Sequence, residues 1–263
     1  MNDLFSLAGR CALVTGGSRG IGRMIAAGFL KSGARVVYIS ARKAEACDKT
    51  AAELASLGNC VSLPADISTA EGVNALVEAF RARESTLDIL VNNAGAAWGE
   101  PFETFPEKGW DKVMDLNVKS PFFLTQALHG LLKAAASAAQ PAKVINITSI
   151  DGQRVNPWET YSYQASKAAL IHLTRRMAAR LIQDRIVVTS LAPGAFPSDM
   201  NRAARDHGDG VAKRIPAQRI GYDEDMAGAA IYLASRAGDY VVGETLTVDG
   251  GVVNANMGGS IDG

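Results

Sequence analysis

Short apolar runs alternate along the chain with longer amphipathic stretches that are rich in alanine. The runs are apolar throughout, which indicates strands that are buried on both faces. We therefore predict strands over Cys11–Thr15, Arg35–Ser40, Val61–Leu63, Leu87–Asn92, Val144–Thr148, Val187–Leu191 and Thr245–Val248. Helices are predicted over Gly20–Ser32, Ala44–Leu57, Ala70–Arg83, Trp110–Lys133, Tyr161–Gln183 and Asp223–Ser235. This order predicts a doubly wound α/β fold, with a parallel sheet of about seven strands and helices on both faces.

The length of 263 residues fits one large α/β domain over residues 1–263. The segment from Pro193 to Pro216 lacks clear periodicity. A loop of that length in a compact domain is usually functional or mobile. The glycine-rich end of the chain, residues 252–263, is expected to be a flexible tail.

Composition and charge exclude several classes of protein. Basic and acidic residues balance at 27 each, so no charge excess indicates a nucleic-acid partner. No apolar run approaches the roughly 20 residues that cross a bilayer, and the first residues do not have the pattern of a secretory signal. The three cysteines are scattered, which fits a cytoplasmic protein. The three histidines show no metal-ligand spacing, so no metal site is predicted.

A glycine-rich turn directly follows the first predicted strand and opens the first helix. Such a turn lets the backbone approach a pyrophosphate, and the helix N-terminus supplies free N–H donors. The same pattern also occurs in simple tight turns. The predicted cofactor-binding residues of this turn are Gly16, Ser18, Arg19, Gly20, Ile21 and Gly22.

The end of the second strand bears on the choice of dinucleotide. Proteins that prefer NAD usually carry an acidic residue about 20 positions after the glycines. Here the strand ends in Ser40-Ala41-Arg42, without a carboxylate. Arg42, together with Arg19, is suited to a 2′-phosphate, and we therefore predict NADP(H). The alternative is that both arginines are solvated surface charges.

Two further segments lie where a dinucleotide would extend along the sheet. Asp66 and Ile67 follow the third strand, where a carboxylate would hold an adenine amine, although acids are also common near helix N-termini. Asn93, Ala94 and Gly95 follow the fourth strand at the carboxyl edge, where ligands bind in such folds. Their alternative role is that of ordinary turn residues.

Tyr163 and Lys167 lie four residues apart in a predicted helix, so their side chains share one face. A free phenol has a pKa of about 10, and a nearby ammonium favours the phenolate. We therefore expect Lys167 to lower the pKa of Tyr163 and so make the phenol an acid/base group near neutral pH. Tyr161 lacks this spacing. The spacing alone also arises by chance.

Two polar residues strengthen this interpretation. Ser149 follows the apolar strand Val144–Thr148, so its hydroxyl is expected at the carboxyl edge of the sheet, where it would polarise a carbonyl. Asn117 sits within an otherwise apolar helical stretch. It is either satisfied locally or holds a water that connects Lys167 to solvent.

These motifs together resemble the short-chain dehydrogenase/reductase family in order and spacing over most of the chain. The resemblance implies a Rossmann-like fold and a catalytic tetrad of Asn117, Ser149, Tyr163 and Lys167. Tyr163 and Lys167 would also contact the cofactor. Further residues would hold the nicotinamide: Pro193, Gly194, Phe196 and Ser198, the last replacing the usual threonine. The segment of about residues 195–216 would cover the substrate, which Ser149, Asp151 and Tyr163 would contact.

Within the family, the chain resembles bacterial 3-oxoacyl reductases and the branch linked to rhamnolipid biosynthesis. That resemblance implies reduction of a small ketone, including acyl thioesters, and a homotetramer or homodimer. The polar segment Asp151–Glu159 counts against a purely fatty-acyl pocket. The alternatives are a reductase or dehydrogenase of a sugar, a polyol or another small ketone, and a dinucleotide-sensing module without catalysis.

Overall fold

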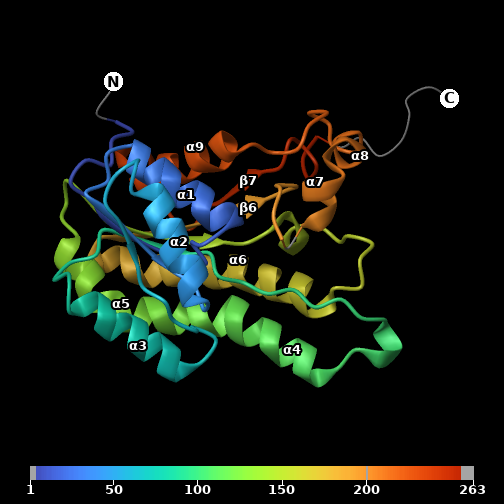
Figure 1. Ribbon diagram of the computed structural model, residues 1–263, viewed down its shortest axis with the longest axis horizontal. Coiled ribbons are helices and arrows are strands. Elements are labelled where there is room, and N and C mark those ends of the chain that lie inside the picture. Colours follow the sequence, from blue (N-terminus) through green and yellow to red (C-terminus); the bar gives the residue numbers. More distant parts are fainter. Residues whose placement is uncertain (1–3, 200, 256–263) are drawn as a thin grey trace.

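Seven parallel strands form one sheet in the computed structural model, which describes residues 4–199 and 201–255 (Figure 1). Their order across the sheet is β3-β2-β1-β4-β5-β6-β7. All seven predicted strands are present, with ends shifted by at most two residues, and the predicted fold class is confirmed. The strands are β1 (Cys11–Thr15), β2 (Val36–Ser40), β3 (Cys60–Ser62), β4 (Ile89–Asn92), β5 (Ala142–Ile147), β6 (Ile186–Pro193) and β7 (Thr245–Val248).

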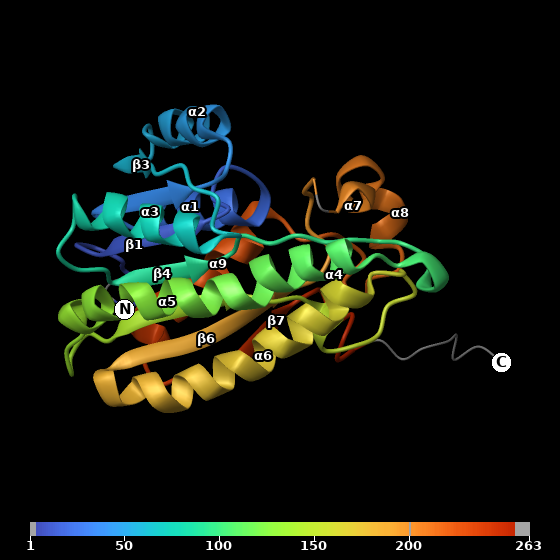
Figure 2. The same cartoon turned by 90° about the horizontal axis from the view of Figure 1, so that it is seen from below.

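The helices cover both faces of this sheet (Figures 1 and 2). Helices α1, α2 and α9 pack on one face around the buried Phe29 and Met226, and α3, α5 and α6 pack on the other around Phe80 and Leu128. The described helices are α1 (Gly20–Lys31), α2 (Ala44–Leu54), α3 (Ala70–Arg81), α4 (Glu107–Met114), α5 (Ser120–Ala135), α6 (Tyr161–Leu181), α7 (Arg202–Asp206), α8 (Gly208–Ala212) and α9 (Asp223–Ala234).

The structure corrects two predicted segments. The helix predicted over Trp110–Lys133 is two helices, α4 and α5, joined by a π-helical turn over Asp115–Lys119. The apolar pattern continues through the turn, so periodicity does not reveal it. The loop predicted between Pro193 and Pro216 contains the short helices α7 and α8, which are too short to produce a periodic signal.

The predicted flexible tail also begins differently. Val252 is only 9% exposed and packs with Ile150 and Ile215, so the first part of the 252–263 segment is held against the body of the protein. Residues 256–263 of that prediction lie outside the described residues. Among the described helices, none combines the length and the apolar character needed to cross a membrane.

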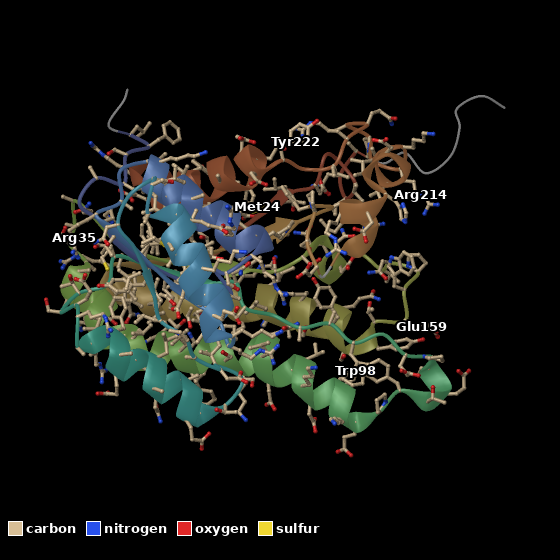
Figure 3. The ribbon with its side chains drawn as sticks, in the orientation of Figure 1. Met24, Arg35, Trp98, Glu159, Arg214 and Tyr222 are labelled. Atoms are coloured by element: carbon tan, nitrogen blue, oxygen red, sulfur yellow. The ribbon has the colours of Figure 1, made fainter. Side chains whose placement is uncertain are left out.

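The strand order places the switch point of the sheet between β1 and β4. The chain leaves β1 toward β2 on one side and later returns to β4 on the other, and in open α/β sheets ligands bind at the carboxyl ends of the strands at such a point. Figure 3 shows Trp98 on the side of the molecule opposite Arg35, which directly precedes β2. Because β1, β4, β5 and β6 are parallel, the segments that follow them all lie at the carboxyl edge of the sheet.

Removing the Phe29 ring tests the core beneath this edge. Phe29 on α1 is fully buried, so we expect Phe29→Ala to lower the free energy of unfolding by about 3–5 kcal/mol. The matched control is Phe102→Ala, because Phe102 is 72% exposed and should cost about 1 kcal/mol or less. Urea unfolding of the three proteins measures both changes, and equal losses would contradict the placement of Phe29.

Candidate active site

The glycine turn between β1 and α1 is built for close approach of another molecule to the backbone. Gly16 and Gly20 have positive φ angles of 64° and 52°, which other residues rarely adopt. A Cβ atom on Gly16 would lie 2.7 Å from Nδ2 of Asn93, and one on Gly22 would overlap the Gly16 carbonyl oxygen. Arg19 precedes α1 without a side-chain cap, which leaves the first N–H groups of the helix free for an anion. This geometry fits a pyrophosphate.

A hydroxyl that the sequence analysis missed fastens the glycine turn to the β4 loop. Oγ1 of Thr15 accepts hydrogen bonds from the backbone N–H groups of Asn93 and Ala94, each at 3.0 Å. Nδ2 of Asn93 in turn donates to the carbonyl oxygens of Thr15, at 2.8 Å, and Gly16, at 3.2 Å. The glycine turn and the β4 loop are therefore one connected unit. A threonine at the end of an otherwise apolar strand is the signal that would have indicated this role.

The end of β2 carries features that suit the adenosine half of a dinucleotide. The hydroxyl of Ser40 is buried and has no hydrogen-bond partner among the described residues. Arg42 is exposed two residues later. Asp66 uses one carboxylate oxygen to accept from the backbone N–H and hydroxyl of Ser68, at 3.1 and 2.7 Å, while Ile67 is buried. An orphaned hydroxyl beside an exposed arginine fits a ribose with a 2′-phosphate.

Lys167 is buried one helical turn after Tyr163 on α6, with 5% of its surface exposed. Its ammonium donates to the carbonyl oxygen of Ile147, the last residue of β5, at 2.8 Å. It lies 5.6 Å from the centre of the Tyr163 ring, and a Cβ atom on Gly95 would be 3.7 Å from it. Burial lowers the pKa of Lys167 to about 8 because the charged form loses its hydration.

Tyr163 departs from the sequence-based expectation. Burial raises the pKa of its phenol to about 12, a hydrogen bond with Ser149 acts in the opposite direction, and the nearby Asp151 carboxylate adds to the rise. We expected Lys167 to lower this pKa, and that expectation is wrong for the protein without ligand. The physical reason is that desolvation exceeds any attraction by an ammonium that donates to Ile147. Tyr163 is therefore a neutral phenol near pH 7.

Asn117 lies in the π-helical turn, and both its amide nitrogen and its amide oxygen bond to the protein. Its Nδ2 donates to the carbonyl oxygen of Ala96 and to Oγ of Ser166, both at 2.9 Å, and its Oδ1 accepts from the Ala96 N–H at 2.8 Å. Ser166 then donates to the carbonyl oxygen of Tyr163 at 2.7 Å. Asn117 thus ties the β4 loop to the first turn of α6. Ser166 is a further supporting residue that the sequence analysis did not identify.

Ser149 lies just beyond β5 at the same edge. Its Oγ accepts from the Asp151 N–H at 3.1 Å and starts a short 3₁₀ turn over Ile150–Gly152. Tyr161 is exposed and donates to Oε1 of Glu159 at 3.1 Å, so it lies apart from this group. The four residues of the predicted tetrad therefore come from the π-helical turn, the end of β5 and the start of α6.

The segment predicted to hold a nicotinamide continues from β6. The Gly194 N–H donates to the carbonyl oxygen of Val248, and a Cβ atom on Gly194 would lie 2.7 Å from Asp249. Pro193 and Phe196 are buried. Oγ of Ser198 accepts from the Asn201 N–H at 3.0 Å, so this hydroxyl stabilises the approach to α7.

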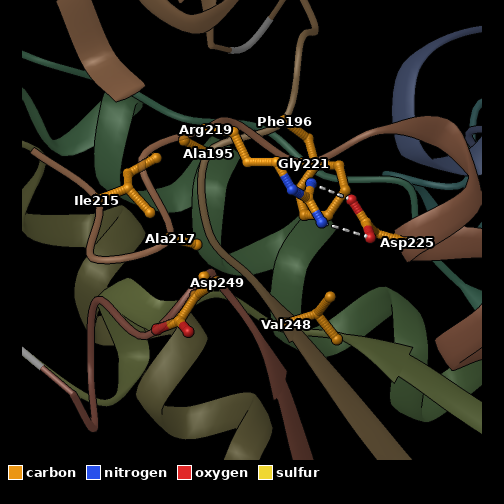
Figure 4. Close-up of a pocket in the computed structure, with 10 residues that line it drawn as sticks. Ala195, Phe196, Ile215, Ala217, Arg219, Gly221, Asp225, Val248 and Asp249 are labelled. Carbon is orange, nitrogen blue, oxygen red and sulfur yellow. Dashed lines mark hydrogen bonds and ion pairs between the residues drawn. The ribbon is translucent and has the colours of Figure 1, made fainter. Parts of the chain in front are cut away.

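A cavity of about 90 Å³ lies beside this segment (Figure 4). Its walls include Phe196, Ile215 and the ion pair between Arg219 and Asp225. It is too small for a dinucleotide, and its described lining does not include Tyr163. It therefore belongs to the packing that supports the nicotinamide segment. Among the described residues, no cluster of histidine, cysteine or carboxylate side chains is arranged to hold a metal ion.

Comparison with known proteins places this geometry in a family. Residues 16–253 match the family model described as enoyl-(acyl carrier protein) reductase. The chain is 48% identical to the rhamnolipids biosynthesis 3-oxoacyl-[acyl-carrier-protein] reductase of Pseudomonas aeruginosa, over 95% of this chain and 99% of that protein. It is 37% identical to the 5-keto-D-gluconate 5-reductase of Escherichia coli, over 97% of this chain and 100% of that protein. The solved Pseudomonas aeruginosa RhlG/NADP active-site complex has a TM-score of 0.93 and 48% identity, covering 96% of this chain and 100% of that one.

The chain belongs to the short-chain dehydrogenase/reductase family, and it is therefore an oxidoreductase. The similarity at 48% identity confirms the resemblance to the rhamnolipid-type branch of 3-oxoacyl reductases.

The pKa of Lys167 gives a test of the site without substrate. The folded protein releases the Lys167 proton near pH 8, whereas an unfolded lysine holds it to about pH 10.4. The unfolded chain then binds more protons between these values, so this group makes stability rise with pH across that window. We expect the stability of the wild type relative to Lys167→Met to increase from pH 8 to pH 10.5.

Urea unfolding of both proteins between pH 7 and pH 10.5 measures this difference. The control is Lys49→Met, which removes an exposed lysine from α2 and should change stability equally at every pH. A pH-independent difference between the wild type and Lys167→Met would show that the Lys167 ammonium is not buried.

Proposed function

We propose that this chain is an NADPH-dependent reductase that converts a 3-oxoacyl thioester to its 3-hydroxy product, with Tyr163 as the proton donor. The observation that carries the proposal is the buried Lys167 ammonium, which the Ile147 carbonyl holds 5.6 Å from the centre of the Tyr163 ring, one helical turn after that tyrosine. A group that donates a proton must hold one at neutral pH, and burial, which raises the pKa of the Tyr163 phenol, keeps it protonated there.

Bound NADPH supplies the hydride that reduces the carbonyl carbon. The Ser149 and Tyr163 hydroxyls hydrogen-bond the ketone oxygen, which orients and polarises the carbonyl. Tyr163 gives its proton to this oxygen as charge develops there, so the ketone gains a hydride and a proton and becomes an alcohol. The phenolate left on Tyr163 is stabilised by the positive charge of Lys167 until a proton from solvent restores the phenol. Asn117 and Ser166 keep the two helix turns in place.

We choose NADPH over NADH because of Arg19 and Arg42, and because the end of β2 has no carboxylate. Ser40-Ala41-Arg42 offers a buried hydroxyl without a partner and an exposed guanidinium where NAD-dependent proteins place a carboxylate. The Pseudomonas aeruginosa relative was solved as a complex with NADP. These observations support assignment of the 2′-phosphate to Arg42, with Arg19 as a second contact.

The structure also bears on the polar segment after Ser149. Gln153 is hydrogen-bonded to Oγ1 of Thr247 at 3.0 Å, and Asn156 binds the Trp158 N–H and Nε2 of Gln164. These two side chains are satisfied within the protein, so they do not require a polar substrate, and an acyl thioester is compatible with them.

Reduction of a sugar ketone is the second proposed function, and the similarity to the 5-keto-D-gluconate 5-reductase is what favours it. Asp151 is half-buried beside the Tyr163 phenol, where its carboxylate is suited to hydrogen-bond a sugar hydroxyl. The activity screen below includes 5-keto-gluconate so that the two functions are compared directly.

We extend the proposal to a homotetramer or homodimer in the cytoplasm. Exposed Phe122 and Phe123 lie on the outer face of α5, next to a groove between α5 and α6 that His129 and Met177 line. Exposed phenylalanine side chains beside such a groove suit a contact between subunits.

The arginine assignment predicts a selective loss of NADPH use. We expect the wild type to have a higher kcat/KM for NADPH than for NADH, and Arg42→Ala to raise the KM for NADPH about tenfold or more because a charge-assisted contact to the phosphate is lost. The KM for NADH should stay within about twofold, since NADH lacks that phosphate. Initial rates with both cofactors measure this, and equal or better use of NADH by the wild type would contradict the assignment.

The role of Tyr163 is tested by removing only its hydroxyl. We expect Tyr163→Phe to lower kcat at least about 100-fold, since general acid catalysis contributes that much, while the Kd for NADPH changes little. Tyr161→Phe is the matched control, because that tyrosine is exposed and outside the site, and it should keep its activity. NADPH oxidation is followed with 3-oxoacyl thioesters, 5-keto-gluconate, small diketones and steroid ketones. Substantial residual kcat in Tyr163→Phe would argue against the assigned proton donor.

A further inference from the structure

One ion-pair cluster joins the glycine turn to the segment that follows β6. Arg19, in the turn before α1, contacts Oδ2 of Asp199 through Nη1 at 2.6 Å. Arg205 on α7 contacts the other carboxylate oxygen, Oδ1, at 2.5 Å. The two segments are also close in their backbones, because a Cβ atom on Gly20 would lie 3.2 Å from Cβ of Ser198. Asp199 thus joins the glycine turn to the segment that follows β6.

A cofactor phosphate that binds Arg19 would compete with Asp199, the partner of Arg19 in this cluster. Arg19 is one of the two arginines assigned to the 2′-phosphate under the proposed function. Arg205 also pairs with Asp206, at 2.7 Å, so the cluster has four members. All four side chains are substantially exposed, and an exposed ion pair is weak because water and salt screen it. A phosphate monoester carries close to two negative charges near pH 7, whereas Asp199 carries one. The phosphate is therefore the stronger partner for Arg19.

We propose that Asp199 is a specificity-determining residue that competes with the 2′-phosphate of NADPH for Arg19. Binding of NADPH transfers Arg19 from Asp199 to the phosphate and leaves Asp199 on Arg205, so the segment that carries α7 is released from the glycine turn. NADH has no 2′-phosphate and leaves the Arg19–Asp199 pair in place. Asp199 thereby couples the identity of the cofactor to the segment predicted to cover the substrate. This inference rests on the proposed function.

The first test measures binding alone, without substrate. Kd values for NADPH and NADH are determined by fluorescence titration for the wild type, Asp199→Asn, Arg19→Ala and the double variant, at low and high salt. Removing the competitor should tighten NADPH binding about two- to fivefold at low salt, and less at high salt, with the Kd for NADH unchanged. In the Arg19→Ala background, Asp199→Asn should have no effect on the Kd for NADPH.

The matched control is Asp209→Asn, which makes the same charge change at an exposed position on α8. It should leave both Kd values unchanged. An effect of Asp199→Asn that persists without Arg19 would indicate general repulsion of the phosphate and would overturn the competition. Equal changes for NADPH and NADH, or weaker NADPH binding, would also overturn it.

Amide hydrogen exchange tests the release of the segment. Addition of NADPH to the wild type should increase exchange in the peptide that carries Asn201 and α7, whereas NADH should not. No difference between the two cofactors would contradict the coupling.

The failure of this inference is distinguishable from failure of the proposed function. If the wild type does not prefer NADPH, the cofactor assignment itself fails. If it prefers NADPH and Asp199→Asn leaves that preference unchanged, only the role of Asp199 fails.

Discussion

The buried ammonium of Lys167 is the interaction on which the site depends. An amine with 5% of its surface exposed loses its hydration, and here it is compensated by the Ile147 carbonyl at the end of β5. That hydrogen bond, together with one from Nδ2 of Asn146 on β5 to Oγ1 of Thr174, joins α6 to the sheet. It also places the positive charge behind the Tyr163 ring and beside Gly95. Any shift of α6 would leave a buried charge without a partner, which is far more costly than an ordinary packing change.

The other walls of the site are arranged around this point. The π-helical turn places the Asn117 amide between the β4 loop and Ser166, and Thr15 connects that loop to the glycine turn. The glycine turn, the β4 loop, the π-helical turn and the first turn of α6 thus belong to one hydrogen-bonded frame. The segment after β6 is different, because it is joined to the glycine turn through the exposed Arg19–Asp199 pair. The contacts within the frame are buried or partly buried hydrogen bonds, whereas the contact to the segment after β6 is an exposed ion pair that water and salt screen.

Much of this arrangement was predictable from the sequence. The features that the sequence did not predict were missed for physical reasons. Local patterns predicted the strands, from their apolar runs, and the glycine turn between the first strand and the first helix. The fold confirms the strands and the turn. The spacing of Tyr163 and Lys167 is also a local pattern. The π-helical turn, the short helices α7 and α8 and the Arg19–Asp199 pair were missed. The pair joins residues 180 positions apart, which no local pattern reveals. The pKa of Tyr163 was predicted in the wrong direction because charge proximity can be inferred from spacing, whereas burial cannot.

The most direct measurement follows the hydride. The protein is incubated with a 3-oxoacyl thioester and NADPH that carries deuterium at both positions of nicotinamide C4, and the acyl product is examined by mass spectrometry. The proposed reaction predicts a 3-hydroxyacyl thioester with one deuterium bound to the former carbonyl carbon, formed by the wild type and lost in Tyr163→Phe. Recovery of unchanged thioester with undiminished NADPH would contradict the proposed 3-oxoacyl reductase.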